Sequence, residues 1–161
     1  MRYVSTRGQA PVLNFEEAML SGLARDGGLY LPETIPAFAG LETLDGLPYE
    51  KVAFRVIRPF TGDCFTDAEL RGAIDRAYAR IAHAARAPLV QLAPGHHLLE
   101  LFHGPTLAFK DFAMQLIAQL FEIALKRSGR KITIVGATSG DTGSAAIEAF
   151  RGIDNVDVFI M

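Results

Sequence analysis

One lysine of this sequence stands among aromatic residues, where an amine can act as a nucleophile. Lys110 follows Phe109 and precedes Asp111 and Phe112, at the start of a predicted helix. Desolvation by the rings and the partial positive charge of a helix N-terminus both favour a neutral amine. A neutral amine can attack an aldehyde and form a Schiff base. The alternative is a structural lysine whose charge is paired with Asp111 and whose tip reaches solvent.

A second candidate segment is a loop rich in Gly, Ser and Thr, between a predicted strand and a predicted helix. Residues 136–143 read Gly-Ala-Thr-Ser-Gly-Asp-Thr-Gly. Such a loop gathers backbone N–H groups and hydroxyls beside a positive helix terminus, and it can therefore hold a phosphate or a carboxylate. The spacing of its glycines matches neither a P-loop nor the G-x-G-x-x-G pattern, and Asp141 disfavours a plain phosphate site. The alternative is a tight turn whose hydroxyls only cap the helix.

The elements that must position these two segments alternate between strand and helix. A long helix is predicted over 111–127, ending at Ser128-Gly129, and another over 144–151. Strands are predicted over 131–135 and 156–161, where β-branched and aromatic residues dominate. This alternation predicts an α/β fold with a parallel, doubly wound sheet built from right-handed βαβ units. A short strand is predicted over 98–102 and a turn over 103–106.

The preceding part of the chain predicts an accessory lobe of helices and turns. Asn14 and Glu17 have the spacing of a capping box for a helix through Leu23. Thr66 and Glu69 have the same spacing and predict a helix over 67–86. The core-facing residues of this second helix are predicted to be Leu70, Ile74, Ala77, Tyr78 and Ile81. We expect a lobe over 1–95 and the first part of an α/β domain over 96–161.

Composition excludes several classes of protein. Half of the 161 residues are apolar, 21% are charged and the net charge is −2. The basic residues are scattered, which argues against binding to nucleic acid or to an anionic membrane surface. Cys64 is the only cysteine, so an internal disulfide and a cysteine zinc cluster are excluded. With no secretory signal and no candidate membrane span, we expect a cytoplasmic protein without a metal site.

The two candidate segments together resemble the threonine synthase family. The resemblance rests on Glu-Leu-Phe-His-Gly-Pro-Thr-Leu-Ala-Phe-Lys-Asp-Phe at 100–112 and on Ala-Thr-Ser-Gly-Asp-Thr-Gly at 137–143. The stretch from Phe15 to Pro32, with Arg-Asp-Gly-Gly-Leu-Tyr-Leu-Pro at its end, is also similar to that family. These enzymes use pyridoxal 5′-phosphate (PLP) and have the fold type of the tryptophan synthase β chain, PLP fold type II. The resemblance therefore implies a PLP enzyme of threonine biosynthesis.

The resemblance also implies roles for individual residues. Lys110 would carry PLP as a Schiff base and then move protons on the substrate. Thr138, Ser139, Gly140 and Thr142 would hold the substrate α-carboxylate. Asp141 would lie beside the 3′-oxygen of the cofactor. The implied reaction converts O-phospho-L-homoserine and water to L-threonine and phosphate.

Members of this family are longer than 161 residues, so we expect the N-terminal portion of a longer protein. The loop that holds the cofactor phosphate belongs to the later part, and the isolated chain is therefore expected to be inactive. An open sheet edge could cause self-association. Three alternatives stay open: a threonine-synthase-like phospho-lyase, a non-catalytic folding or interaction fragment, and a nucleotide-binding protein.

Overall fold

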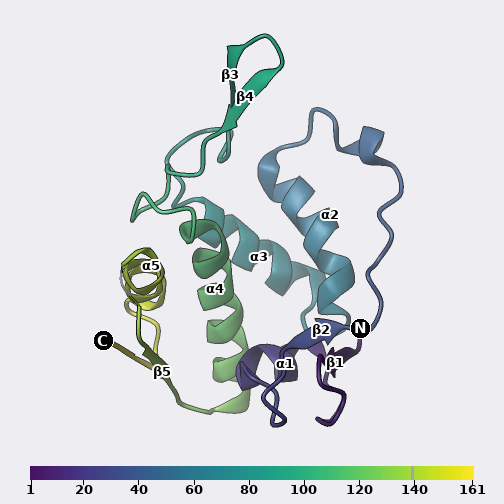
Figure 1. Cartoon of the computed structure of the whole chain (residues 1–161), viewed down its shortest axis with the longest axis vertical. Helices are drawn as coiled ribbons and strands as arrows, with labels where there is room; N and C mark the ends of the chain where they lie inside the picture. Colours follow the sequence, from purple (N-terminus) through teal and green to yellow (C-terminus); the bar gives the residue numbers. More distant parts are fainter. Residues whose placement is uncertain (139) are drawn as a thin grey trace. The chain divides into compact units, whose positions relative to one another are not determined.

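The computed structural model describes residues 1–138 and 140–161 (Figure 1). The chain divides into two compact units, Met1–Arg71 and Gly72–Met161. Helix α3 (Asp67–Tyr78) contains the boundary between them. Among the described residues, no helix is both long and apolar enough to cross a membrane.

The first unit combines a small antiparallel sheet with short helices around an aromatic core. Its elements in chain order are β1 (Tyr3–Ser5), α1 (Phe15–Ser21), β2 (Tyr30–Pro32), the 3₁₀ helix η1 (Leu41–Leu44) and α2 (Tyr49–Thr61). The ring of Phe15 meets Tyr3 and Phe65 edge-on, at centroid distances of 5.9 and 6.1 Å. Phe65 is 1% exposed, so these rings form the centre of the unit.

The Asp26-Gly27-Gly28 turn is held by one carboxylate. Asp26 accepts the Ser5 hydroxyl at 2.7 and 2.8 Å, and it accepts the N–H groups of Gln9, Ala10 and Gly28 at 2.9, 3.0 and 2.9 Å. Partial burial would raise the pKa of Asp26, but the Ser5 hydroxyl and these amides outweigh it and lower the pKa to about 2. The turn is therefore tied to the segment that follows β1.

Both predicted capping boxes are confirmed. Asn14 Oδ1 accepts the N–H of Glu17, and Glu17 Oε2 accepts the N–H of Asn14, each at 2.9 Å. Thr66 and Glu69 make the same pair of bonds at the start of α3. Helix α1 ends at Ser21, two residues before the predicted Leu23, and the Gly22 N–H closes its last turn on Ala18.

Helix α3 ends eight residues earlier than predicted. After Tyr78 the N–H groups of Arg80 and Ile81 bond three residues back, to Ala77 and Tyr78. The next N–H, of Ala82, donates to the carbonyl of His103 at 2.9 Å, which takes the backbone out of the helix. The five predicted core residues are nevertheless buried, each at 5% exposure or less.

The second unit contains a hairpin and a βαβ unit. Its elements after α3 are β3 (Leu89–Ala93), β4 (His96–Leu99), α4 (Asp111–Ser128), β5 (Ile132–Gly136), α5 (Asp141–Phe150) and β6 (Val156–Ile160). The predicted strand over 98–102 is wrong beyond Leu99. In its place β4 pairs antiparallel with β3, and every residue of this hairpin is exposed.

Strands β5 and β6 run parallel, which confirms an α/β arrangement in this unit. Ile134, Val156 and Val158 pack on the buried residues Ala118, Ala149 and Phe150 of α4 and α5. On the opposite face of the sheet, Val135 pairs with Phe159, and the two are 65% and 60% exposed. The helices thus cover one face of this strand pair.

Helix α4 confirms the long buried helix that the sequence predicts, with its start at Asp111 and its end before Gly129. Gly129 follows it in the left-handed conformation, with its N–H on Leu125. The apolar faces are buried at Leu116, Leu120 and Leu125. A polar stripe runs along the helix through Gln115, Gln119, Glu122 and Lys126.

Candidate active site

Lys110 stands at the junction between a tight turn and helix α4. Its carbonyl accepts the N–H of Met114 at 3.0 Å, so the helical hydrogen bonding begins at Lys110 itself. The Lys110 Nζ lies 4.9 Å from the centroid of the Phe109 ring. Phe109 is 55% exposed, so the amine and the ring lie together at the surface of the unit.

The alternative that Lys110 is paired with Asp111 is wrong. Both carboxylate oxygens of Asp111 accept hydrogen bonds from Thr106, and the side chain is fully buried. Among the described residues, the Lys110 amine makes no ion pair, and its contact is the Phe109 ring. The amine is therefore available to a ligand.

The glycine-rich segment begins at the end of β5 and enters α5 earlier than predicted. Helix α5 starts at Asp141 rather than Ser144, so Asp141, Thr142 and Gly143 form its first turn. The Thr138 hydroxyl oxygen accepts the Gly143 N–H at 3.0 Å and so caps that turn. A Cβ on Gly143 would lie 2.8 Å from Ile160 Cγ2, so only glycine lets α5 approach β6 this closely.

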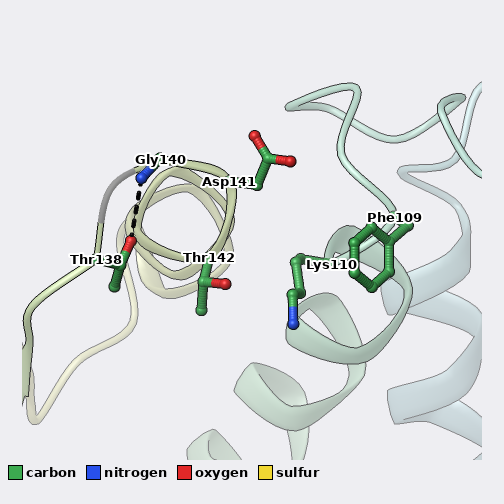
Figure 2. Close-up of a pocket in the computed structure, with 6 residues that line it drawn as sticks. All are labelled: Phe109, Lys110, Thr138, Gly140, Asp141 and Thr142. Carbon is green, nitrogen blue, oxygen red and sulfur yellow. Dashed lines mark hydrogen bonds between the residues drawn. The ribbon is translucent and has the colours of Figure 1, made fainter.

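One hollow of about 420 Å³ joins the two segments (Figure 2). Phe109 and Lys110 line it from the turn before α4. Across from them, the loop after β5 and the first turn of α5 contribute the remaining lining residues, which are Thr138, Gly140, Asp141 and Thr142. Every predicted site residue that the structure describes lies in this hollow; Ser139 lies outside the described residues.

The hollow combines one amine with the N-terminus of a ten-residue helix. The N–H groups of Asp141 and Thr142 have no acceptor within the helix, because the first turn offers none. Together with the helix dipole they favour an anion, whereas the Asp141 carboxylate opposes a second negative charge. The arrangement suits a ligand with a carbonyl group for the amine and a carboxylate for the helix.

Phe109 is the lining residue that the sequence-based site omitted. Its position next to Lys110 in the sequence could have identified it as a lining residue. His103 lies outside the lining, and its Nε2 is 2.7 Å from Glu100 Oε2. In the described part of the chain, no group of three or more His, Cys, Asp or Glu side chains is arranged to hold a metal ion.

The chain is similar to threonine synthases in sequence and in structure. A family profile described as "Threonine synthase N terminus" matches residues 2–78. The whole chain is 56% identical, over 163 aligned residues, to a threonine synthase of Pseudomonas aeruginosa, of which it spans 35%. The chain therefore spans about a third of the length of the threonine synthases that it matches.

Solved threonine synthases share the fold of the chain. The structure of PLP-bound threonine synthase from Brucella melitensis superposes with a TM-score of 0.96 at 55% identity, covering 99% of this chain and 35% of that one. The Escherichia coli threonine synthase superposes with a TM-score of 0.85 at 34% identity, again over 99% of this chain and 36% of that chain. The chain is also 43% identical to threonine synthase-like 2 of Rattus norvegicus, over 100% of its length and 34% of that relative.

Proposed function

We propose that the full-length protein containing this chain is a PLP-dependent threonine synthase, which converts O-phospho-L-homoserine and water to L-threonine and phosphate. The observation that carries the proposal is the shared hollow: an amine that makes no ion pair among the described residues faces a helix N-terminus across one cavity. Its two sides come from the two segments that resemble this family. The similarity to a PLP-bound threonine synthase supports the same assignment.

The residues of the hollow fit PLP and an amino acid substrate. A volume of about 420 Å³ is within the range of small-molecule sites. Lys110 would bind the cofactor through Nζ, and Phe109 would shield that amine from water on one side. Bound PLP supplies an electron sink for negative charge that develops on the substrate carbon atoms.

The remaining lining residues would orient the substrate. The N–H groups of the first turn of α5, with Gly140 and the hydroxyl of Thr142, would hold the α-carboxylate. Thr138 would act on the same group indirectly, because its hydroxyl oxygen fixes the first turn through Gly143. Ser139 would complete this set, and Asp141 would face the cofactor. Lys110 would return protons to the substrate from its position opposite the loop.

The parallel pair β5–β6 would then be the start of a larger doubly wound sheet. A parallel sheet is covered on both of its faces in nearly all α/β proteins, and here one face is open. The 161-residue chain alone would supply one side of the site. We expect no measurable threonine formation from it.

The experiment that tests the proposal is reduction with borohydride after incubation of the full-length protein with PLP. Peptide mapping by mass spectrometry then locates the cofactor. We expect the label at Lys110, with Lys131 as the internal reference because it is a surface lysine in an ion pair with Asp157. Lys110→Ala should remove the selective label and leave the reference unchanged. Equal labelling of the two lysines would contradict the proposal.

A threonine-synthase-like phospho-lyase is the second candidate, because the chain is also 43% identical to threonine synthase-like 2 of the rat. Both candidates release phosphate from the same substrate. They differ in the organic product, since a lyase that does not hydrate the substrate releases 2-oxobutyrate and ammonia. Quantifying threonine and 2-oxobutyrate from the full-length protein separates the two.

A further inference from the structure

A buried carboxylate and a half-buried threonine bracket the segment that carries Lys110. Asp111 is fully buried, with Oδ2 accepting the Thr106 N–H at 2.9 Å and Oδ1 accepting the Thr106 hydroxyl at 2.8 Å. Both distances are those of well-formed hydrogen bonds. We call this pair the Thr106–Asp111 clasp. It joins the two ends of the turn that places Lys110.

Gly104 is in close contact with the Asp111 side of the clasp. A Cβ on Gly104 would lie 2.3 Å from Asp111 Oδ2 and 2.5 Å from Asp111 Cβ, closer than any real contact. The backbone at Gly104 therefore lies directly against the carboxylate. Its carbonyl also accepts the N–H of Leu107 at 3.1 Å, which closes a turn that contains Thr106.

The backbone between the two clasp residues is strained. Leu107 has φ of +64°, in the left-handed region that a side chain with a Cβ disfavours. Leu107 is 72% exposed, so burial of its own side chain does not offset that cost. Strained backbone persists where its surroundings hold it, and such positions concentrate at functional sites.

The clasp and the hollow lie on opposite sides of the same short segment. Phe109 and Lys110 line the hollow, whereas Asp111 points into the interior and is absent from the lining. Successive residues at a helix start point about 100° apart, so fixing Asp111 also fixes the direction in which Lys110 leaves the backbone. Asp111 thus acts on the site through Lys110.

We propose that Thr106 and Asp111 are positioning residues, which hold Lys110 at the distance and angle its reaction with PLP requires. This inference rests on the proposed function and adds the residues that control its lysine. A misplacement of about 1 Å in a reacting group can lower a rate by roughly 100-fold. The clasp is therefore a determinant of how fast Lys110 reacts, without any contact to the cofactor.

The test compares Thr106→Val, which removes the hydroxyl at nearly constant volume, with Thr106→Ser, which keeps it. Thr106 is only half-buried, so both variants are expected to fold. The full-length protein is incubated briefly with PLP, reduced and digested, and the ratio of label at Lys110 to label at Lys131 is measured. We expect Thr106→Val to lower this ratio by roughly tenfold or more and Thr106→Ser to keep it within about twofold of wild type. For Asp111→Asn, which leaves one oxygen acceptor, we expect a labelling ratio between those of Thr106→Val and Thr106→Ser.

The labelling ratio separates positioning from loss of fold. General unfolding raises labelling at other lysines and reduces circular dichroism, whereas misplacement of Lys110 changes neither. If folded Thr106→Val keeps the wild-type labelling ratio, the clasp does not position Lys110. The proposed function would be unaffected by that result. An absence of selective labelling in the wild-type protein would overturn the proposed function, and the clasp with it.

Discussion

At the scale of single residues, neighbours in the sequence occupy opposite environments. Lys110 faces an open hollow, while Asp111 is fully buried and bonded to Thr106. The start of a helix makes this possible, because each step turns the side chain by about 100°. The adjacency of a lysine and an aspartate in the sequence suggested an ion pair, whereas in the structure Asp111 is bonded to Thr106.

Asp26 gives a pH-dependent prediction at the same scale. Its pKa in the folded protein is about 2, below the ordinary value of 3.8, so folding favours the ionised form. The stabilisation is therefore fully present above about pH 4 and is lost as the pH falls through 2. We expect Asp26→Asn to destabilise the protein at pH 7, and we expect the difference from wild type to shrink between pH 4 and pH 2. Denaturant unfolding of both proteins at pH 7, 4 and 2 measures the difference in their free energies of unfolding.

The matched control is Asp45→Asn, at an exposed carboxylate that follows η1. It should change the free energy of unfolding little, and equally at all three pH values. A difference between Asp26→Asn and wild type that is constant with pH would contradict the assigned role of the carboxylate.

At the scale of elements, the polar stripe of α4 changes its environment along the helix. Gln119 accepts a bond from Arg76 at 2.6 Å, and Glu122 pairs with Lys126 at 2.6 Å. Gln115 is 1% exposed, and its Nε2 has no hydrogen-bond partner among the described residues. A buried donor without an acceptor costs about 1–3 kcal/mol. The stripe is thus stabilising near the end of the helix and costly near its start.

Gln115→Met is therefore predicted to stabilise the protein, against the usual direction for a buried substitution. Methionine has a similar length and no donor to desolvate, so we expect a gain of about 1 kcal/mol in the free energy of unfolding. Gln119→Met is the control on the same stripe, and it should cost about 0.5–1 kcal/mol because it removes the bond to Arg76. A loss at Gln115 larger than the loss at Gln119 would mean that the buried amide has an acceptor.

Elements were predictable where a local signal defines them. The capping boxes at Asn14 and Thr66 and the glycine after α4 fixed three helix ends correctly. The end of α3 was missed because it depends on a bond to His103, a contact from a later part of the chain. Strands β1 and β2 have three residues each, too few for a periodic pattern, and α2 was not recognised among the surrounding turn residues.

The candidate site was more predictable than the fold around it. Residue type marked Lys110 and the glycine-rich loop as candidates beside structural alternatives, and the family resemblance then favoured a role for both. Residues of both segments line the hollow. The helical setting of Asp141 and Thr142 was missed, because the cap that starts α5 comes from Thr138, three residues upstream of the helix. The hollow itself depends on how β5, α4 and α5 pack, which spacing in the sequence does not specify.

At the scale of the whole molecule, the open face of the β5–β6 pair predicts self-association of the 161-residue chain. Val135 and Phe159 are paired in register and exposed, beside unpaired strand edges. We expect the apparent mass from light scattering to rise with concentration, and Phe159→Lys to abolish the rise. Ile147→Lys, at a 49% exposed position on α5, should leave it unchanged. A wild-type chain that stays monomeric over the series would contradict the prediction.

The six described residues that line the hollow all fall within positions 109–142. At about 5–20 residues per second, a ribosome makes Lys110 and the first turn of α5 within a few seconds of each other. Contacts between segments this close in sequence require little loop closure and form early. The lysine and its opposing loop can therefore meet while the nascent chain is still being extended.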